Sequence, residues 1–251
     1  MVGIGAGLAG ALAALTTVIT ALAPSVGLGM VGWTVGLLCG VAMAACVRLG
    51  LVRSGTAALG PADLVTLARA TVACVAAALV ADSFLSDPAV TGIVVLSSVV
   101  LVLDAVDGWV ARRTRATPFG ARFDGEVDAF LILVLSVYVA SSAGAWVLAI
   151  GLARYAFAAA GWVWPWMRRP LPYRYWRKVV AAVQGVVLAV AAADVAAPWV
   201  ATVALLGALL LLAESFGRDV LWLWNRRHWT LEGSDETSRA GASSHTPERV
   251  P

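Results

Sequence analysis

The chain consists of long apolar runs that glycine, proline or charged residues interrupt at fairly regular intervals. A helix needs about 20 mostly apolar residues to cross the hydrocarbon core of a bilayer. Eight runs of about that length can be marked off, with an error of a few residues at each boundary. They lie near residues 3–23, 29–49, 64–82, 89–110, 121–141, 145–166, 178–197 and 199–224. The pattern predicts an all-α integral membrane protein with about eight spans.

Composition agrees with this pattern, because 61% of the 251 residues are hydrophobic and only 13% are charged. A soluble domain has about 45–50% apolar and about 25% charged residues. The three cysteines, Cys39, Cys46 and Cys74, lie inside apolar runs without the spacing of a metal site. We expect them to be small packing residues.

Among the connections between the predicted spans and the segment that closes the last one, positive residues occur only in every second one, around residues 48–53, 112–122, 168–178 and 218–227. The other connections, "APSVGLG", "DSFLSDP", "SSAG" and "AADVAAP", contain no Lys or Arg. This alternation follows the positive-inside rule, so both termini should face the cytoplasm and the protein should be a multi-pass protein of the plasma membrane. The positive-inside rule then explains the net charge of +3, and we expect no nucleic-acid partner.

The sequence divides into three parts. Residues 1–55 form two transmembrane helices, residues 56–231 form a six-span domain with every candidate for chemistry, and residues 232–251 form a disordered cytoplasmic tail. The first helix should be retained, because the segment before "ALA" lacks the positive charge of a signal peptide. Glycines recur every four residues from Gly32 to Gly40 and allow close helix approach. We favour packing within the chain over dimerisation as their use.

Four aspartates interrupt the apolar pattern in the middle of the chain. Asp104 and Asp107 are three residues apart and Asp124 and Asp128 four apart, so on helices each pair occupies one face. A hairpin with a short basic connection at 112–118 can bring the pairs together near the cytoplasmic interface. Four carboxylates cannot all stay ionised side by side in a poorly hydrated place without cations. Ligands that are all oxygen point to Mg²⁺, Mn²⁺ or Ca²⁺.

Two glycines lie beside these aspartates. Gly108 follows the first pair, and Gly120 precedes Asp124 by one helical turn, so bare backbone is open to a flat or bulky ligand. Four arginines between residues 112 and 122 supply positive charge suited to phosphate groups. Glu126 lies about 200° round the helix from Asp124, and we exclude it from the ligand set.

The whole stretch resembles the signature of the CDP-alcohol phosphotransferase family (CDP-alcohol phosphatidyltransferases), membrane enzymes of phospholipid synthesis. The matching run is Asp104-x-x-Asp107-Gly108-x-x-Ala111-Arg112, then seven residues, then Gly120-x-x-x-Asp124-x-x-x-Asp128, with all eight fixed positions present. The lead-in "PADLVTLARA" is also similar to the family's, with Ala62 where Asn is usual. The resemblance covers about residues 60–224 and implies a six-helix core preceded by two extra transmembrane helices.

The resemblance implies an activity and a role for each matching residue. The enzyme would transfer a phosphatidyl group from CDP-diacylglycerol to a small polar alcohol and release CMP, with the donor's tails among the membrane lipids. Two ions of Mg²⁺ or Mn²⁺ would be held by Asp104, Asp107, Asp124 and Asp128. The cytidine and diphosphate would be bordered by Gly108, Ala111, Arg112 and Gly120. Asp128 would also be the general base, and the family resemblance suggests a homodimer.

The acceptor is indicated only by basic residues. Arg154 is the only basic residue besides Arg69 that lies deep in a predicted span, and a buried arginine is costly and usually pairs with another group. Arg154 could neutralise the aspartates of a neighbouring helix or bind the phosphate of the acceptor, and the sequence does not separate these uses. Together with Arg174, Arg177 and Lys178, it favours glycerol 3-phosphate or an inositol phosphate as acceptor, although the positive-inside rule alone predicts most of these residues.

Two alternatives belong to other functional classes. Intramembrane aspartates also occur in ion pathways, so a divalent-cation transporter is the second hypothesis. A non-catalytic relative that only binds the CDP-lipid is the third, and the intact set of aspartates argues against it. The glycines and Arg112 favour the enzyme.

Overall fold

The structure is a computed structural model that describes residues 2–26, 28–54, 58–86, 89–113, 118–169, 171–172 and 175–226. Within these residues, the α-helices are α1 (Ile4–Val26), α2 (Met30–Ser54), α3 (Pro61–Asp82), α4 (Val90–Arg113), α5 (Pro118–Ala143), α6 (Leu148–Val163), α7 (Tyr175–Ala192) and α8 (Pro198–Asn225). Short 3₁₀ helices η1 (Ala145–Val147) and η2 (Pro165–Arg168) flank α6. Two-residue strands β1 (Val2–Gly3) and β2 (Ala58–Leu59) pair antiparallel. The predicted all-α class is confirmed.

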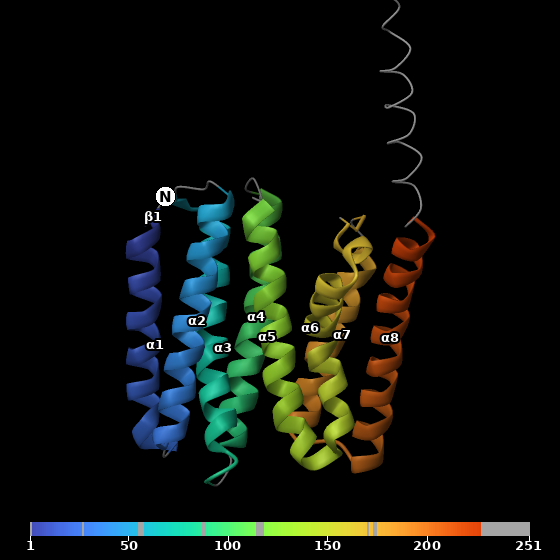
Figure 1. Cartoon of the computed structure of the whole chain (residues 1–251). Coiled ribbons are helices and arrows are strands. Elements are labelled where there is room, and N and C mark those ends of the chain that lie inside the picture. The colour runs from blue at the N-terminus through green and yellow to red at the C-terminus, as the bar shows by residue number, and fades with distance from the viewer. Residues whose placement is uncertain are drawn as a thin grey trace, which may run out of the picture.

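The helices run up and down side by side, with α1 at one side of the molecule and α8 at the other (Figure 1). Helix α1 begins and α8 ends at the same end of the bundle. In this arrangement successive connections lie at opposite ends of the bundle, which agrees with basic residues in every second connection. That this end faces the cytoplasm stays a prediction.

Several helices are long and apolar enough to cross a membrane, and they indicate a membrane protein. In the described part of the chain, five helices meet this criterion: Met30–Ser54, Pro61–Asp82, Phe119–Ala143, Ala145–Val163 and Pro198–Asn225. Gly5–Ala21 and Val90–Asp104 are shorter apolar helices. The eight predicted runs each coincide with a helix, and the number of spans stays a prediction.

Helix α3 is the most buried of the five candidate spans. In its apolar stretch 67% of residues are buried, against 17–39% in the other four candidate spans. Small side chains make this possible, since Ala73, Ala76 and Ala78 are fully covered where α2, α4 and α5 pack against α3. Most residues of α3 are therefore covered by neighbouring helices.

The glycine ridge of α2 packs inside the chain, as we favoured. A Cβ at Gly36 would lie 3.0 Å from Cβ of Ala78, and one at Gly32 would lie 3.0 Å from the Ala78 carbonyl oxygen. Backbone contact between α2 and α3 therefore depends on these glycines. At the end of the bundle away from the N-terminus, Asp82 of α3 accepts hydrogen bonds from the amides of Gly29 (2.9 Å) and Gly32 (3.3 Å), which begin α2.

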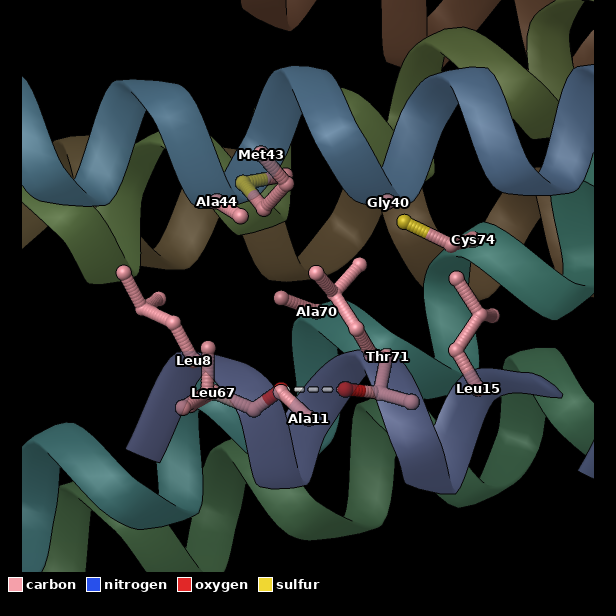
Figure 2. A pocket seen from close by; sticks show the side chains of 11 residues that line it. Leu8, Ala11, Leu15, Gly40, Met43, Ala44, Leu67, Ala70, Thr71 and Cys74 are labelled. Carbon is pink, nitrogen blue, oxygen red and sulfur yellow. Dashed lines mark hydrogen bonds between the residues drawn. The ribbon is translucent and has the colours of Figure 1, made fainter. Parts of the chain in front are cut away.

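A small apolar cavity of about 20 Å³ lies where α1, α2 and α3 meet (Figure 2). Leu8, Ala11 and Leu15 of α1 line it opposite residues of α2 and α3. Cys74 also lines it and is buried, and Cys39 is half-buried, as expected of packing residues. For Cys46 the expectation is wrong, because this side chain is exposed on the surface of α2.

Candidate active site

The α4–α5 hairpin brings three of the four motif aspartates together. Asp124 and Asp128 lie one turn apart on α5. Pro118 begins this helix, because the fixed φ angle of proline suits the first helical position. Asp104 comes from α4, and one carboxylate oxygen from each residue lies within 4.8 Å of the others. The three side chains are 40% (Asp104), 21% (Asp124) and 30% (Asp128) exposed, so a solute can reach them.

Arg69 of α3 lies behind these carboxylates and pairs with all three. Its Nη1 is 2.5 Å from Oδ1 of Asp124 and its Nη2 is 3.0 Å from Oδ1 of Asp104. The same Nη2 donates to Asp128. The side chain of Arg69 is only 1% exposed. The sequence placed Arg69 deep in a predicted span but gave it no partner and no role, because periodicity along one helix does not show which side chains of other helices it meets.

Helix α7 brings a second cation to the cluster. Lys178 Nζ lies 4.0 Å from Oδ2 of Asp124, and its side chain is 61% exposed. The neighbouring Arg177 is engaged elsewhere: its Nε lies 2.8 Å from Oδ2 of Asp219 on α8. Arg174, the remaining candidate on this connection, lies outside the described residues.

Arg154 lies in a different environment from the one we expected. Its Nη2 is 2.6 Å from Oε1 of Glu126 and its side chain is 45% exposed, so the expectation of a buried arginine is wrong. The described contacts pair Arg154 with this glutamate and not with the aspartates. Glu126 lies on α5 away from the three-aspartate cluster, in agreement with its exclusion from the ligand set. The pair connects α5 to α6.

Four motif residues lie in the last turns of α4, where the structure describes the backbone but not the side chains: Asp107, Gly108, Ala111 and Arg112. Gly120 lies in the first turn of α5 and is partly buried. The roles predicted for these residues stay predictions.

The face of α5 opposite the aspartates is held by apolar packing. The rings of Phe119 and Phe123 stack with centroids 5.8 Å apart, and both join a buried cluster with Val47 and Leu51 of α2. Phe119 lies so close to α2 that a Cβ at Gly50 would be 2.6 Å from its ring. The amino-terminal helices therefore support the segment that carries Asp124 and Asp128, a role that the sequence pattern did not indicate.

The donor set fits a hard divalent cation. All the described donor atoms of the cluster are carboxylate oxygens, the ligands that Mg²⁺, Mn²⁺ and Ca²⁺ prefer. Among the described side chains, three carboxylates face two cations, Arg69 and Lys178, so negative charge remains to attract a metal ion.

Comparison with known proteins identifies one family. The family model described as CDP-alcohol phosphatidyltransferase matches residues 59–213, which is more than half of the chain and includes all four aspartates. No curated protein and no solved structure matches the chain. The family match gives no support to the cation-transporter alternative.

Proposed function

The chain belongs to the CDP-alcohol phosphatidyltransferase family, and on this premise we propose that it transfers a phosphatidyl group from CDP-diacylglycerol to a small alcohol and releases CMP. The observation that carries the proposal is the convergence of Asp104, Asp124 and Asp128 from two helices at a place that solutes can reach. Membrane helices around this place leave the lipid tails of the donor in the bilayer.

The aspartates are the proposed metal ligands. Asp104, Asp124 and Asp128, together with Asp107, would hold two ions of Mg²⁺ or Mn²⁺ close to the diphosphate of the donor. When bound, such ions neutralise charge on the phosphates and stabilise the leaving CMP. The cytidine and diphosphate would be bordered by Gly108, Ala111, Arg112 and Gly120.

Asp128 is the proposed general base. Its carboxylate takes the proton of the acceptor hydroxyl, and the hydroxyl oxygen then attacks the phosphorus that carries the diacylglycerol. A new oxygen–phosphorus bond forms as the bond from that phosphorus to the CMP oxygen breaks. The proton remains on Asp128 until it is lost to solvent, and the partial exposure of this side chain allows that exchange.

Lys178 is the best-supported contact for a phosphate on the acceptor. It is largely exposed beside Asp124, whereas Arg177 and Arg154 are already paired with acids. Arg174 would supply a second charge. This supports glycerol 3-phosphate or an inositol phosphate as the acceptor. The acceptor would bind at the cytoplasmic face of the plasma membrane, and the family resemblance suggests that the protein forms a homodimer.

The test is an assay of the purified full chain with CDP-diacylglycerol, Mg²⁺ or Mn²⁺ and a panel of acceptors. Release of CMP is expected with one of the phosphate-bearing acceptors. Asp128→Asn should lower kcat by about a hundredfold or more, as loss of a general base does. Glu126→Gln is the matched control, since it neutralises an acid on the same helix that points away from the cluster.

The transferase hypothesis would be wrong if no acceptor yields CMP while vesicles containing the protein take up Mn²⁺ in a manner that needs Asp124. That result would favour the transporter.

A further inference from the structure

Arg69 is bonded to the atoms that a metal ion needs. Its two terminal nitrogens contact Oδ1 of Asp104, Asp124 and Asp128, so one guanidinium links α3 to both helices of the hairpin. The planar fork of arginine is suited to holding several carboxylate oxygens at once. The aspartates are therefore already assembled by a cation that belongs to the chain.

Burial keeps Arg69 where it is. The side chain is 1% exposed on the most buried of the five candidate spans, whereas the three aspartates, which are 21–40% exposed, are open on their other side. A metal ion must enter from that open side, with Arg69 still a few ångströms away. Two like charges at such a distance repel strongly in a poorly hydrated site. Arg69 therefore stabilises the metal-free cluster and weakens its affinity for metal.

A diphosphate changes this balance, because it brings negative charge to the open side of the cluster. We propose that Arg69 is a positioning residue that keeps the metal-free aspartates assembled and makes metal binding depend on the CDP-linked donor. The inference rests on the proposed function, since it takes the aspartates to be the metal site. Metal and nucleotide then strengthen each other's binding reciprocally. An enzyme of this kind holds its metal firmly only when the donor is bound.

The experiment is a titration of the full chain in detergent with Mn²⁺, in which the spin resonance of free Mn²⁺ is followed with and without CDP. A protein-free titration corrects for the Mn²⁺ that CDP binds by itself. In the wild type, CDP should lower the Mn²⁺ dissociation constant severalfold. Arg69→Met should lower it by about tenfold or more without CDP, because the repelling charge is gone. The added effect of CDP should then shrink.

Two further variants separate charge from structure. Arg69→Lys keeps the charge, and its Mn²⁺ affinity should stay close to that of the wild type. Arg218→Met removes an arginine that is 64% exposed and pairs with Glu214 on its own helix, and it should change nothing. Equal or weaker Mn²⁺ binding by Arg69→Met than by the wild type would overturn the inference and leave the proposed metal site intact. Absence of Mn²⁺ binding by the wild type, even with CDP, would overturn both.

Thermal unfolding keeps the test decisive if Arg69→Met is too unstable to titrate. Without metal, this variant should unfold at a lower temperature than the wild type, because its carboxylates then repel one another. Mn²⁺ should raise its unfolding temperature by more than it raises that of the wild type. An equal or smaller rise would overturn the inference.

Discussion

Four charged side chains are buried among the residues that the structure describes. Each of them either contacts another helix or caps the end of a helix. They are Asp63, Arg69, Asp82 and Asp219. Asp63 accepts from the amide of Gly60, Asp82 from the start of α2, and Asp219 pairs with Arg177. Removal of one partner leaves the other charge buried and unpaired, which costs more than the pair itself contributes.

The Arg177–Asp219 pair is predicted to hold α7 against α8. Asp219→Asn should destabilise the fold by about 1–3 kcal/mol, less than for a fully buried pair because Arg177 is partly exposed. Thermal unfolding in detergent measures this. Arg218→Met, which removes an exposed ion pair within α8, is the control and should cost no more than about 1 kcal/mol. Equal losses in the two variants would contradict the prediction.

Lys178 is predicted to act on the acceptor and not on the donor. Lys178→Met should raise the KM of the phosphate-bearing acceptor by about tenfold, as expected for loss of one charge-assisted contact, and leave the KM of the donor unchanged. Steady-state kinetics with each substrate varied in turn separate the two constants. A rise confined to the donor KM would place Lys178 at the diphosphate instead.

The helices themselves could be predicted from the sequence, because apolar runs of membrane length leave few alternatives. The spacing of Asp104, Asp124 and Asp128 also indicated that they could converge, since a short connection between two helices allows the faces that carry these residues to meet. The three partners of Arg69, by contrast, depend on how α3, α4 and α5 pack together. Likewise the surface position of Arg154 follows from the placement of α6, which periodicity along one helix does not give.

The attachment of α2 to α3 is predicted to depend on Asp82. Asp82→Ala removes the acceptor for two amides at the start of α2, and loss of a helix cap costs about 0.5–2 kcal/mol. Ser86→Ala removes only a side-chain hydroxyl that donates to Asp82 and should cost less. Unfolding temperatures of the two variants compare the effects. A larger loss for Ser86→Ala would show that the cap is not the important contact.

In the molecule as a whole, helix α2 of the amino-terminal pair packs against α5 of the α4–α5 hairpin, which carries the proposed active site. Gly50→Ala should displace Phe119 and with it the start of α5, because the added Cβ would lie 2.6 Å from the ring. We expect kcat to fall by up to about tenfold, since small displacements of catalytic groups are costly. Gly207→Ala on α8 is the matched control, because a Cβ there meets nothing within 4 Å. Unchanged kcat in Gly50→Ala would separate the amino-terminal helices from catalysis.

The most direct measurement follows both products of the reaction at once. The full chain is incubated with CDP-diacylglycerol, Mn²⁺ and either glycerol 3-phosphate or an inositol phosphate, and CMP and the lipid product are quantified by mass spectrometry. We predict equimolar CMP and phosphatidyl-acceptor with one of the two acceptors, and neither product when Asp124 is replaced by Asn. CMP without any phosphatidyl-acceptor, or no CMP with either acceptor, would contradict the proposed transfer.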